Sequence, residues 1–505
     1  MAEVVNTLKR EAARTGDSAK KPEEKPGKLY EARKKIFPRA VSGHFRRLKW
    51  TLATIFMGIY FILPWIRWDR GPGAPDQAVL VDLAHRRFYF FFIEIWPQEF
   101  YYVAGLLILA GIGLFIATSM VGRAWCGYAC WQTVWTDLFM LVERKIEGDR
   151  NAQIKLEKQP WNAEKILKRG LKHLVWALIA FWTAFTFILY FGNAPDVAYW
   201  FFTGQAPFVA YSTVAIMGFV TYFFAGVMRE QVCIYMCPWP RIQGAMVDED
   251  TLIVTYHDWR GEPRGSKREQ KLHPEVQFGD CIDCGWCVQV CPTGIDIRDG
   301  QQLACITCAL CIDACNQVME KIGKPQGLIS YSSVRAYEKL TTGQMKQTEF
   351  GWRSFIRPRT IVYLLVWTLI ATALLVHLAT RDRLRVNVIH DRSPLFVRLS
   401  TGEIRNSYTV RMLNMQLEPR DFRLSMVGLE GGKMRILGIN KPPARSFTIR
   451  VPGNKAKSLR VFVTLPKDKV REPHEAFYFR IEALGPDGKV EESAEKKAIF
   501  EAPAK

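Results

Sequence analysis

Cysteines give this chain its clearest chemical signal, because eight of the twelve fall in two consecutive runs of identical spacing, CxxCxxCxxxC. The runs consist of Cys281, Cys284, Cys287 and Cys291, and of Cys305, Cys308, Cys311 and Cys315. Thiolates are the soft ligands that iron–sulfur clusters require, and this spacing is typical of segments that bind 4Fe-4S clusters. The sequence therefore predicts two 4Fe-4S clusters and the transfer of single electrons.

The ligand sets follow from a general pattern, since the fourth cysteine of each run ligates the other cluster in two-cluster ferredoxins. The expected sets are Cys281, Cys284, Cys287 and Cys315 for cluster 1, and Cys305, Cys308, Cys311 and Cys291 for cluster 2. The first run is followed by Pro292, whereas the second is followed by Asn316 and lacks the usual chain-reversing proline. Zinc knuckles are disfavoured, because zinc takes four ligands per site at other separations. A disulfide framework is disfavoured too, since this segment is placed in the reducing cytoplasm.

The other four cysteines form two CxxxC pairs, Cys126 with Cys130 and Cys233 with Cys237. A spacing of four predicts that both thiols of a pair share one helix face. Both pairs follow apolar stretches that are predicted to run inward, so the four thiols are expected at one membrane depth, on the side of the clusters. They could bind a thiophilic ion such as Cu(I), or cycle between dithiol and disulfide. Buried cysteine is also common as a small apolar residue, but a functional interpretation assigns every cysteine to a motif.

Other candidate residues give weaker signals. His377, Met412 and Met415 could contact copper outside the membrane, although an interfacial histidine and two strand methionines explain them more simply. Three arginines flank the cysteine pairs and could stabilise thiolates, namely Arg123, Arg229 and Arg241. Five tryptophans are interpreted as interfacial anchors, namely Trp125, Trp131, Trp135, Trp200 and Trp239. No CxxCH motif or facing histidine pair predicts haem.

Membrane-spanning helices must position these cysteines, because the apolar residues are segregated along the chain. Five uncharged stretches can each supply the roughly 20 apolar residues that cross a hydrocarbon core of about 30 Å. The stretches are residues 50–66, 100–122, 173–195, 197–228 and 360–380. In the fourth, a re-entry is expected before the span proper, near 208–228. The sequence therefore predicts a bundle of five transmembrane helices.

The net charge of +20 does not indicate nucleic-acid binding, because the basic residues follow the membrane pattern instead. Fourteen Lys and Arg lie in residues 1–49 and ten in 123–172, whereas none lies in 192–208. By the positive-inside rule the N-terminus, the loop 123–172 and the cysteine-rich region are cytoplasmic. The loop 67–99 and everything after Arg381 are then expected outside.

The chain divides into five predicted regions. Residues 1–45 form a basic cytoplasmic tail whose composition predicts disorder, and residues 46–247 contain spans 1–4 with the CxxxC motifs. Residues 248–357 form a ferredoxin-like insert with both clusters, and residues 358–380 form span 5. Residues 381–505 contain short alternating runs separated by turn residues, which predict an all-β immunoglobulin-like sandwich. This last region has no cysteine, so burial alone must stabilise its core.

Long segments resemble the FixG/CcoG family, also called RdxA. The most specific segments are GRAWCGYACWQTVWTDLFMLVER, REQVCIYMCPWPRIQGAM, CIDCGWCVQVCPTGIDIRDG, CITCALCIDACNQVMEKIGKPQGLISY and HDRSPLFVRLSTGEIRNSYTVRMLNM. The resemblance implies a protein of the bacterial inner membrane that reduces Cu(II) to Cu(I) during assembly of cbb3-type cytochrome c oxidase. Its implied partners are that oxidase and its assembly or copper-delivery proteins, and the electron donor is left open.

The resemblance also assigns roles to residues. The family's membrane CxxxCP motifs match Cys126, Cys130, Cys233 and Cys237, which would be catalytic and could bind copper. The chain departs from the motif at Trp131, which replaces a proline and leaves the preceding residue freer to remain helical. Two other functions are compatible with the motifs: a quinol-oxidising conduit resembling NapH or the membrane part of NosR, and a non-enzymatic scaffold for oxidase assembly. The outer β-domain argues against NapH, and the lack of an N-terminal flavin-binding domain argues against NosR.

Overall fold

The computed structural model describes residues 35–71, 74–343, 356–381, 384–416, 418–453, 455–485 and 487–503. Within these residues, five helical segments are long and apolar enough to cross a membrane: His44–Trp65, Pro97–Val121, Ala163–Leu189, Phe208–Met228 and Pro358–Ala379. Each overlaps one of the five predicted stretches. Of the basic tail, residues 1–45, that was predicted to be disordered, residues 1–34 lie outside the described residues.

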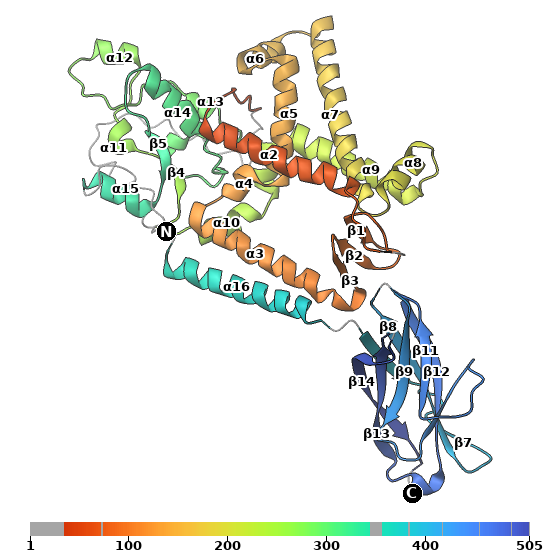
Figure 1. Cartoon of the computed structure of the whole chain (residues 1–505). Coiled ribbons are helices and arrows are strands. Elements are labelled where there is room, and N and C mark those ends of the chain that lie inside the picture. Colours follow the sequence, from red (N-terminus) through yellow and green to blue (C-terminus); the bar gives the residue numbers. More distant parts are fainter. Residues whose placement is uncertain are drawn as a thin grey trace.

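The candidate spans form two groups rather than the single bundle that hydropathy predicted (Figure 1). In one group α3 (Tyr101–Val121) lies along α16 (Pro358–Ala379), and the indole of Trp367 donates to the Leu109 carbonyl at 3.0 Å. In the other group α2 (His44–Ile62) and α7 (Ala163–Leu189) pack against α5 (Trp131–Glu147), and α9 (Phe208–Thr221) packs against α7. A shared core holds α2, α5, α7 and the π-helical turn Tyr222–Met228 together, because their apolar side chains meet around Trp135, Phe139 and Trp176. The first group joins the second through short helices at the end where the CxxxC motifs lie.

Several elements lie between the spans. A three-stranded antiparallel sheet occupies the predicted outer loop, with strands β1 (Val79–Asp82), β2 (Arg87–Phe90) and β3 (Ile93–Ile95). The predicted basic loop 123–172 is helical over most of its length. Its elements are α4 (Ala124–Tyr128), α5, α6 (Arg150–Lys158) and the start of α7. Short helix α8 (Ala194–Phe202) precedes α9 in the segment where a re-entry was expected.

The cysteine-rich domain, defined here as residues 248–343, follows the fourth span. Strands β4 (Ile253–Tyr256) and β5 (Ile329–Ser332) pair antiparallel and close the domain at its two ends. Its helices are α11 (Asp258–Gly261), α12 (Lys267–Leu272), α13 (Trp286–Gln289), α14 (Leu310–Lys321) and α15 (Val334–Thr341). Residues 35–43, predicted as part of the tail, contact this domain: the Arg39 amide donates to the Gln289 carbonyl at 2.8 Å.

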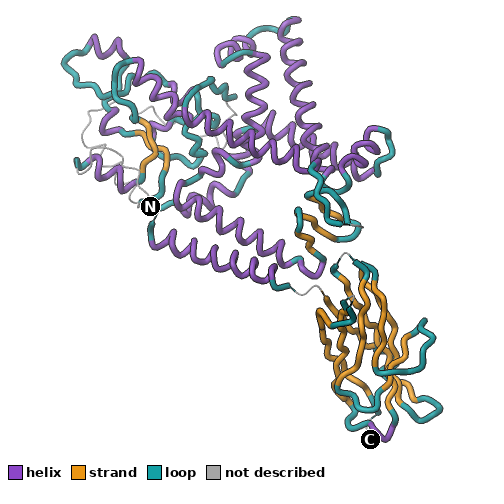
Figure 2. Tube along the Cα trace, viewed as in Figure 1, coloured by secondary structure: helices purple, strands orange, loops and turns teal. Residues whose placement is uncertain are grey.

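The C-terminal region is a β-sandwich, which stands apart from the helical part in Figure 2. One sheet has the order β10-β12-β8-β6 with β7 paired to β8, and the other has the order β11-β9-β13-β14. The strands are β6 (Leu384–His390), β7 (Val397–Arg398), β8 (Ile404–Asn414), β9 (Arg420–Val427), β10 (Lys433–Ile436), β11 (Ser446–Val451), β12 (Lys455–Leu465), β13 (His474–Leu484) and β14 (Val490–Glu501). Alternating side chains of both sheets form the core, and fully buried Tyr408, Phe477 and Phe479 pack edge to face within it.

Candidate functional site

The two cysteine runs fold into loops with the same backbone pattern. In the first loop Asp283 (φ 49°) and Gly285 (φ 65°) are left-handed, and in the second Thr307 (φ 54°) and Ala309 (φ 59°) occupy the equivalent positions. Alternation of left- and right-handed residues turns successive N–H groups toward one point, which is how backbone nests bind anionic Fe–S clusters. The Thr307 amide donates to the Cys305 sulfur at 3.4 Å. Both loops are therefore shaped to surround an anionic group.

Helix α14 brings sulfurs of the two runs together. Burial raises the pKa of Cys315 to about 12, and the neighbouring thiols that add to this rise are Cys281, Cys284 and Cys287 of the first run. Burial likewise raises the pKa of Cys311, with contributions from Cys308 and Cys305 of its own run and from Cys291 and Cys287 of the first. Cys315 therefore faces the first run, and Cys291 faces the second.

The residue after each run sets the length of the helix that follows the loop. Helix α13 ends at Gln289, shortly before Pro292, whereas α14 continues through Asn316 to Lys321. The Asn316 side chain accepts a hydrogen bond from the Gly327 amide at 2.9 Å. The missing proline thus lengthens the second helix, and Asn316 ties that helix to the chain that returns to β5.

The environment of these thiols suits metal ligation. Burial raises the pKa of Cys287 and Cys308 to about 12, so a bound cation is needed to displace their protons at neutral pH. Positive charge offsets part of that burial, from Arg298 at Cys287 and from Lys49 at Cys308. The donor set of eight thiols fits two 4Fe-4S clusters. Cys284 is the exposed member of the twelve, so the first loop lies nearer the surface.

The two CxxxC motifs are also built alike. Span α3 is followed by Gly122 (φ 58°), and the fourth span is followed by Arg229 (φ 48°). Each of these left-handed residues reverses the chain into a short helix, α4 in the first motif and the π-helical turn Val232–Met236 in the second. Residues Cys130 (φ −61°, ψ 130°) and Cys237 (φ −76°, ψ 124°) are both extended.

This geometry corrects two expectations. The cysteines of a pair do not share one helix face, because the second cysteine lies beyond the end of the short helix. The replacement of proline by Trp131 does not keep Cys130 helical, since Cys130 has the same extended backbone as Cys237 before Pro238. The Trp131 ring, which stands where the family motif has proline, stacks on Trp135 with centroids 3.9 Å apart.

The four membrane-end thiols are close enough to interact electrostatically. Burial raises the pKa of Cys233 to about 12, and Cys130, Cys126 and Cys237 add to the rise. Burial also raises the pKa of Cys126, which Arg123 opposes, and the Cys126 thiol donates to Gln243 Oε1 at 3.1 Å. Within the described residues no three His, Cys, Asp or Glu side chains already converge around a single metal position. The thiols are neighbours without forming a closed single-ion site.

Helix α4 rests directly on the second cluster loop. A Cβ added to Gly127 would lie 2.7 Å from the Ile306 carbonyl oxygen and 3.1 Å from Cys308 Cα. The Tyr128 hydroxyl donates to the Cys308 carbonyl at 3.1 Å, and Arg123 donates to the Cys305 carbonyl at 2.9 Å. The first CxxxC motif and the second run therefore form one packed unit, in which Cys126 and Cys308 share an apolar core.

The candidate residues that gave weaker signals in the sequence have structural roles. Met412 is fully buried in the sandwich core, and Met415 packs on Trp96. His377 accepts or donates a hydrogen bond at Nδ1 with the Tyr102 hydroxyl, 2.7 Å away. Trp135 is not an interfacial anchor, because it is buried and its indole donates to Thr183 Oγ1 at 2.9 Å.

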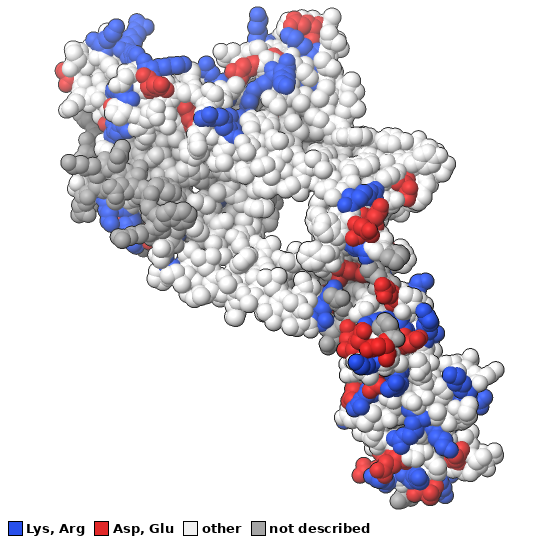
Figure 3. Space-filling model, in the orientation of Figure 1, with Lys and Arg blue, Asp and Glu red and all other residues white. Residues whose placement is uncertain are grey.

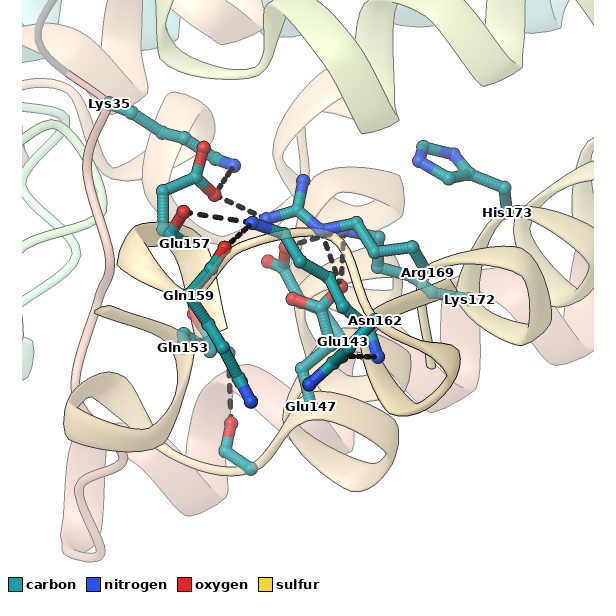
Figure 4. Close-up of polar contacts among 12 residues, drawn as sticks. Lys35, Glu143, Glu147, Gln153, Glu157, Gln159, Asn162, Arg169, Lys172 and His173 are labelled. Carbon is teal, nitrogen blue, oxygen red and sulfur yellow. Dashed lines mark hydrogen bonds and ion pairs between the residues drawn. The ribbon is translucent and has the colours of Figure 1, made fainter. Parts of the chain in front are cut away.

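One group of interacting charged residues was not predicted from the sequence. An ion-pair network joins α5, α6, α7, the residue after the fourth span and the segment before α2. Figure 4 shows the part of it around Glu157, Arg169 and Lys172. Its members are Lys35, Glu143, Glu147, Glu157, Arg169, Lys172 and Arg229. Burial alone would raise the pKa of Glu143, but Arg229 and Lys172 outweigh it and hold that pKa below its ordinary value. The sequence offered one signal for this network: charged residues such as Lys172 lie within the first turns of an otherwise apolar span.

Comparisons with known proteins agree with these features. Family profiles match at residues 228–334 (4Fe-4S dicluster domain), 103–147 (4Fe-4S binding domain) and 374–503 (IG-like fold at the C-terminus of FixG). Nitrogen fixation protein FixG of Rhizobium meliloti is 52% identical over 472 residues, which cover 89% of this chain and 90% of that protein. The chain belongs to the FixG family. Two further FixG relatives come from Cereibacter sphaeroides: protein RdxA, 50% identical over 87% of this chain and 91% of its own length, and protein RdxB, 52% identical over 88% and 92%. This FixG-family chain is a membrane iron–sulfur redox protein with an immunoglobulin-like C-terminal domain.

Proposed function

We propose that this chain reduces Cu(II) to Cu(I) and supplies the product for assembly of cbb3-type cytochrome c oxidase. The observation that carries the proposal is the contact between α4 and the second cluster loop, since it leaves no chain segment between Cys126 and the Cys308 backbone. A one-electron carrier beside four soft thiols suits a one-electron reduction of copper, because thiolates favour Cu(I).

In this proposal Cys281, Cys284, Cys287 and Cys315 hold cluster 1, and Cys305, Cys308, Cys311 and Cys291 hold cluster 2. Each cluster, when bound, would accept and release one electron. Arg298 and Lys49 supply positive charge near Cys287 and Cys308, which favours the more negative, reduced state. Two features support these ligand sets: Cys315 lies beside the thiols of the first run, and the two loops have left-handed residues at matching positions.

The thiols of Cys126, Cys130, Cys233 and Cys237 are the proposed copper ligands. Cys130 and Cys237 follow the ends of short helices, so their positions can adjust when an ion draws the four sulfurs together. Binding displaces the protons that burial keeps on Cys126 and Cys233. One electron from a reduced cluster then converts bound Cu(II) to Cu(I), and no proton or bond is otherwise exchanged.

The proposed location is the bacterial inner membrane, with the N-terminus and cysteine-rich domain in the cytoplasm and the β-sandwich in the periplasm. On the visible face, charged residues gather over the cysteine-rich domain and the α6–α7 hairpin, and again over the sandwich (Figure 3). An uncharged belt formed by the candidate spans separates these two zones, as a bilayer requires. The proposed partners are the oxidase and its assembly or copper-delivery proteins, which the periplasmic domain could contact.

The proposal is tested on protein purified anaerobically and reduced with dithionite. Addition of Cu(II) should restore the absorbance of oxidised clusters and yield one Cu(I) per electron, measured with a Cu(I)-specific chelating dye. Cys233→Ser and Cys237→Ser should abolish Cu(I) formation while iron and sulfide contents stay at the parent values. Cys305→Ser is the contrasting variant, because it should lose cluster iron as well.

Two outcomes would redirect the assignment. Reduced clusters that ignore Cu(II) yet are oxidised by a quinone would indicate the quinone-linked conduit. Binding of purified oxidase without any redox turnover would indicate the scaffold. Unchanged Cu(I) formation in Cys233→Ser would make the membrane-end thiols structural.

A further inference from the structure

A polar cavity lies beside the ion-pair network, at the end of α7 nearest the cysteine-rich domain. It is lined by Lys35, Ile36, Glu143, Arg169, Lys172, His173, Trp176, Gly226, Val227, Arg229 and Glu230. The cations on its wall already have carboxylate partners: Lys172 contacts Glu147 at 2.7 Å, and Arg229 contacts Glu143 at 2.7 Å. Its charged wall is therefore internally neutralised.

His173 differs from the other polar residues of this cavity. Figure 4 shows its ring standing apart from the ion pairs. Its Nδ1 is 2.8 Å from the Tyr222 hydroxyl, and its ring packs edge-on against Trp176 with centroids 5.2 Å apart. When Nδ1 carries the ring proton and donates it to Tyr222, Nε2 is an acceptor for a proton from a ligand.

An apolar groove continues from this histidine along the membrane span. Its walls come from α7, from α9 and from the first residue of the π-helical turn after α9, and consist of Ala177, Ala180, Phe181, Tyr211, Val214, Ala215, Gly218, Phe219 and Tyr222. From Tyr211 to Tyr222 the groove runs about 16 Å at the rise of a helix. Tyr222 belongs to the groove and bonds to His173, so the polar cavity and the apolar groove meet at this pair. A π-helical turn, Tyr222–Met228, begins at the junction, as such turns often do at functional sites.

The polar cavity also touches the redox part of the molecule. Ile36 lines the cavity and packs on the loop that follows the first cysteine run, since a Cβ on Gly294 would lie 2.6 Å from Ile36 Cδ1. Gly294 is three residues after Cys291. On its other side the cavity includes Arg229 and Glu230, which lie four and three residues before Cys233.

We propose that the His173–Tyr222 junction binds a membrane quinol, with its aromatic head in the polar cavity and its apolar tail in the groove. This inference rests on the proposed function, because it names the electron donor of the same clusters. The quinol loses two electrons and two protons and leaves as quinone. One electron goes to each of the two clusters, the first proton goes to His173 Nε2, and the second goes to water in the polar cavity.

Ligand chemistry favours a quinol over an anionic lipid. A phosphate headgroup would need cations without partners, but the lysines and arginines of this wall are paired with the network's carboxylates. A quinol head is neutral and needs only a hydrogen-bond acceptor and an aromatic wall, which His173 and Trp176 provide. Its tail needs a groove open to lipid, and Ala177 and Ala215 line that groove with exposed small side chains.

The test follows cluster reduction without copper. The oxidised holoprotein in detergent is mixed anaerobically with a decyl-substituted benzoquinol, and cluster bleaching and quinone absorbance are recorded together. We expect one quinone for every two clusters reduced. His173→Gln should slow this reaction at least about tenfold by removing the proton acceptor. Ala215→Trp should slow it by a similar factor through filling the groove, with saturation shifted to higher quinol concentration.

The chain offers a matched control at the other end of the membrane. His377 has the same kind of contact, 2.7 Å between its Nδ1 and the Tyr102 hydroxyl, so the clusters of His377→Gln should be reduced by quinol at the parent rate. Reduction by dithionite and Cu(II)-dependent reoxidation should be unchanged in all three variants, which separates this inference from the copper step. Parent-like quinol kinetics in both His173→Gln and Ala215→Trp would overturn the site. If anionic lipid vesicles slowed cluster reduction in the parent protein as much as added quinone does, the quinol site would be overturned in favour of a lipid site.

Discussion

At the scale of single residues, Gly127 decides how closely the thiols approach the clusters. It is helical, and a helix interior usually prefers alanine over glycine by about 1 kcal/mol. Here that preference is opposed by two backbone atoms, the Ile306 oxygen and Cys308 Cα, which cannot move aside as a flexible side chain would. The lack of a side chain at residue 127 is therefore what allows α4 to lie against the second loop.

Gly127→Ala should lower the free energy of unfolding by about 1–3 kcal/mol, because a methyl group overpacks this contact. It should also slow Cu(I) formation from reduced clusters, because the loop and the thiols are pushed apart. Gly111→Ala is the matched control: Gly111 is also helical, and nothing lies within 4 Å of its added Cβ. Thermal unfolding in detergent and stopped-flow copper reduction measure both effects. Equal stability of the two variants would show that the contact is loose.

At the scale of elements, α14 caps the first span. The Asp313 carboxylate accepts from the Arg46 amide at 2.8 Å and from the Phe45 amide at 3.3 Å, in the first turn of α2. Asp313 lies between two cluster cysteines, Cys311 and Cys315, so the capping of a membrane helix and the geometry of a cluster loop depend on one helix. Gly43 makes room for the carboxylate, since a Cβ there would lie 2.2 Å from Asp313 Cγ.

Asp313→Ala should lower the free energy of unfolding by about 0.5–2 kcal/mol, which is the usual contribution of a helix N-cap. Asp313→Asn should cost less, because its amide oxygen can still accept one bond. Gly43→Ala should reproduce the loss by displacing the carboxylate, and Asp299→Ala, an exposed aspartate of the same domain, should be neutral. The temperature at which half of the clusters are released ranks the stabilities of these variants. A parent-like midpoint in both Asp313→Ala and Gly43→Ala would disprove the coupling.

Elements also show where sequence reasoning succeeds and where it stops. Five apolar spans were predictable because composition over about 20 residues decides membrane crossing. The helix-face expectation for the CxxxC pairs failed because helix ends depend on left-handed reversals at Gly122 and Arg229, which tertiary packing selects. Strand β14 gives a weak strand signal in the sequence because Glu and Lys dominate it, as suits an edge strand. The Glu143–Arg229 pair was invisible because 86 residues separate its members.

At the scale of the whole molecule, one ion pair fastens the sandwich to the membrane part. Arg381 follows the last span and contacts Glu99, which is completely buried, at 3.0 Å. It also donates to the Glu94 carbonyl at 2.8 Å, so the small sheet and the entry to α3 both meet the chain that leads into β6.

Arg381→Gln should destabilise this junction by about 3–5 kcal/mol, because Glu99 would remain buried without its partner. Cluster content and absorbance should stay unchanged, since the pair is remote from the cysteine-rich domain. Arg480→Gln, which breaks an exposed pair with Glu495 inside the sandwich, should cost about 0–1 kcal/mol. Denaturant unfolding followed by tryptophan fluorescence distinguishes the two. If Arg381→Gln lowered the free energy of unfolding no more than Arg480→Gln does, the junction would be solvated.

The cap on the first span has a consequence for the order of synthesis. A ribosome makes Phe45 268 residues before Asp313, so α2 enters the bilayer while the carboxylate that completes it does not yet exist. Its first turn must wait, with open amide groups at the membrane surface, until the cysteine-rich domain has been translated and folded.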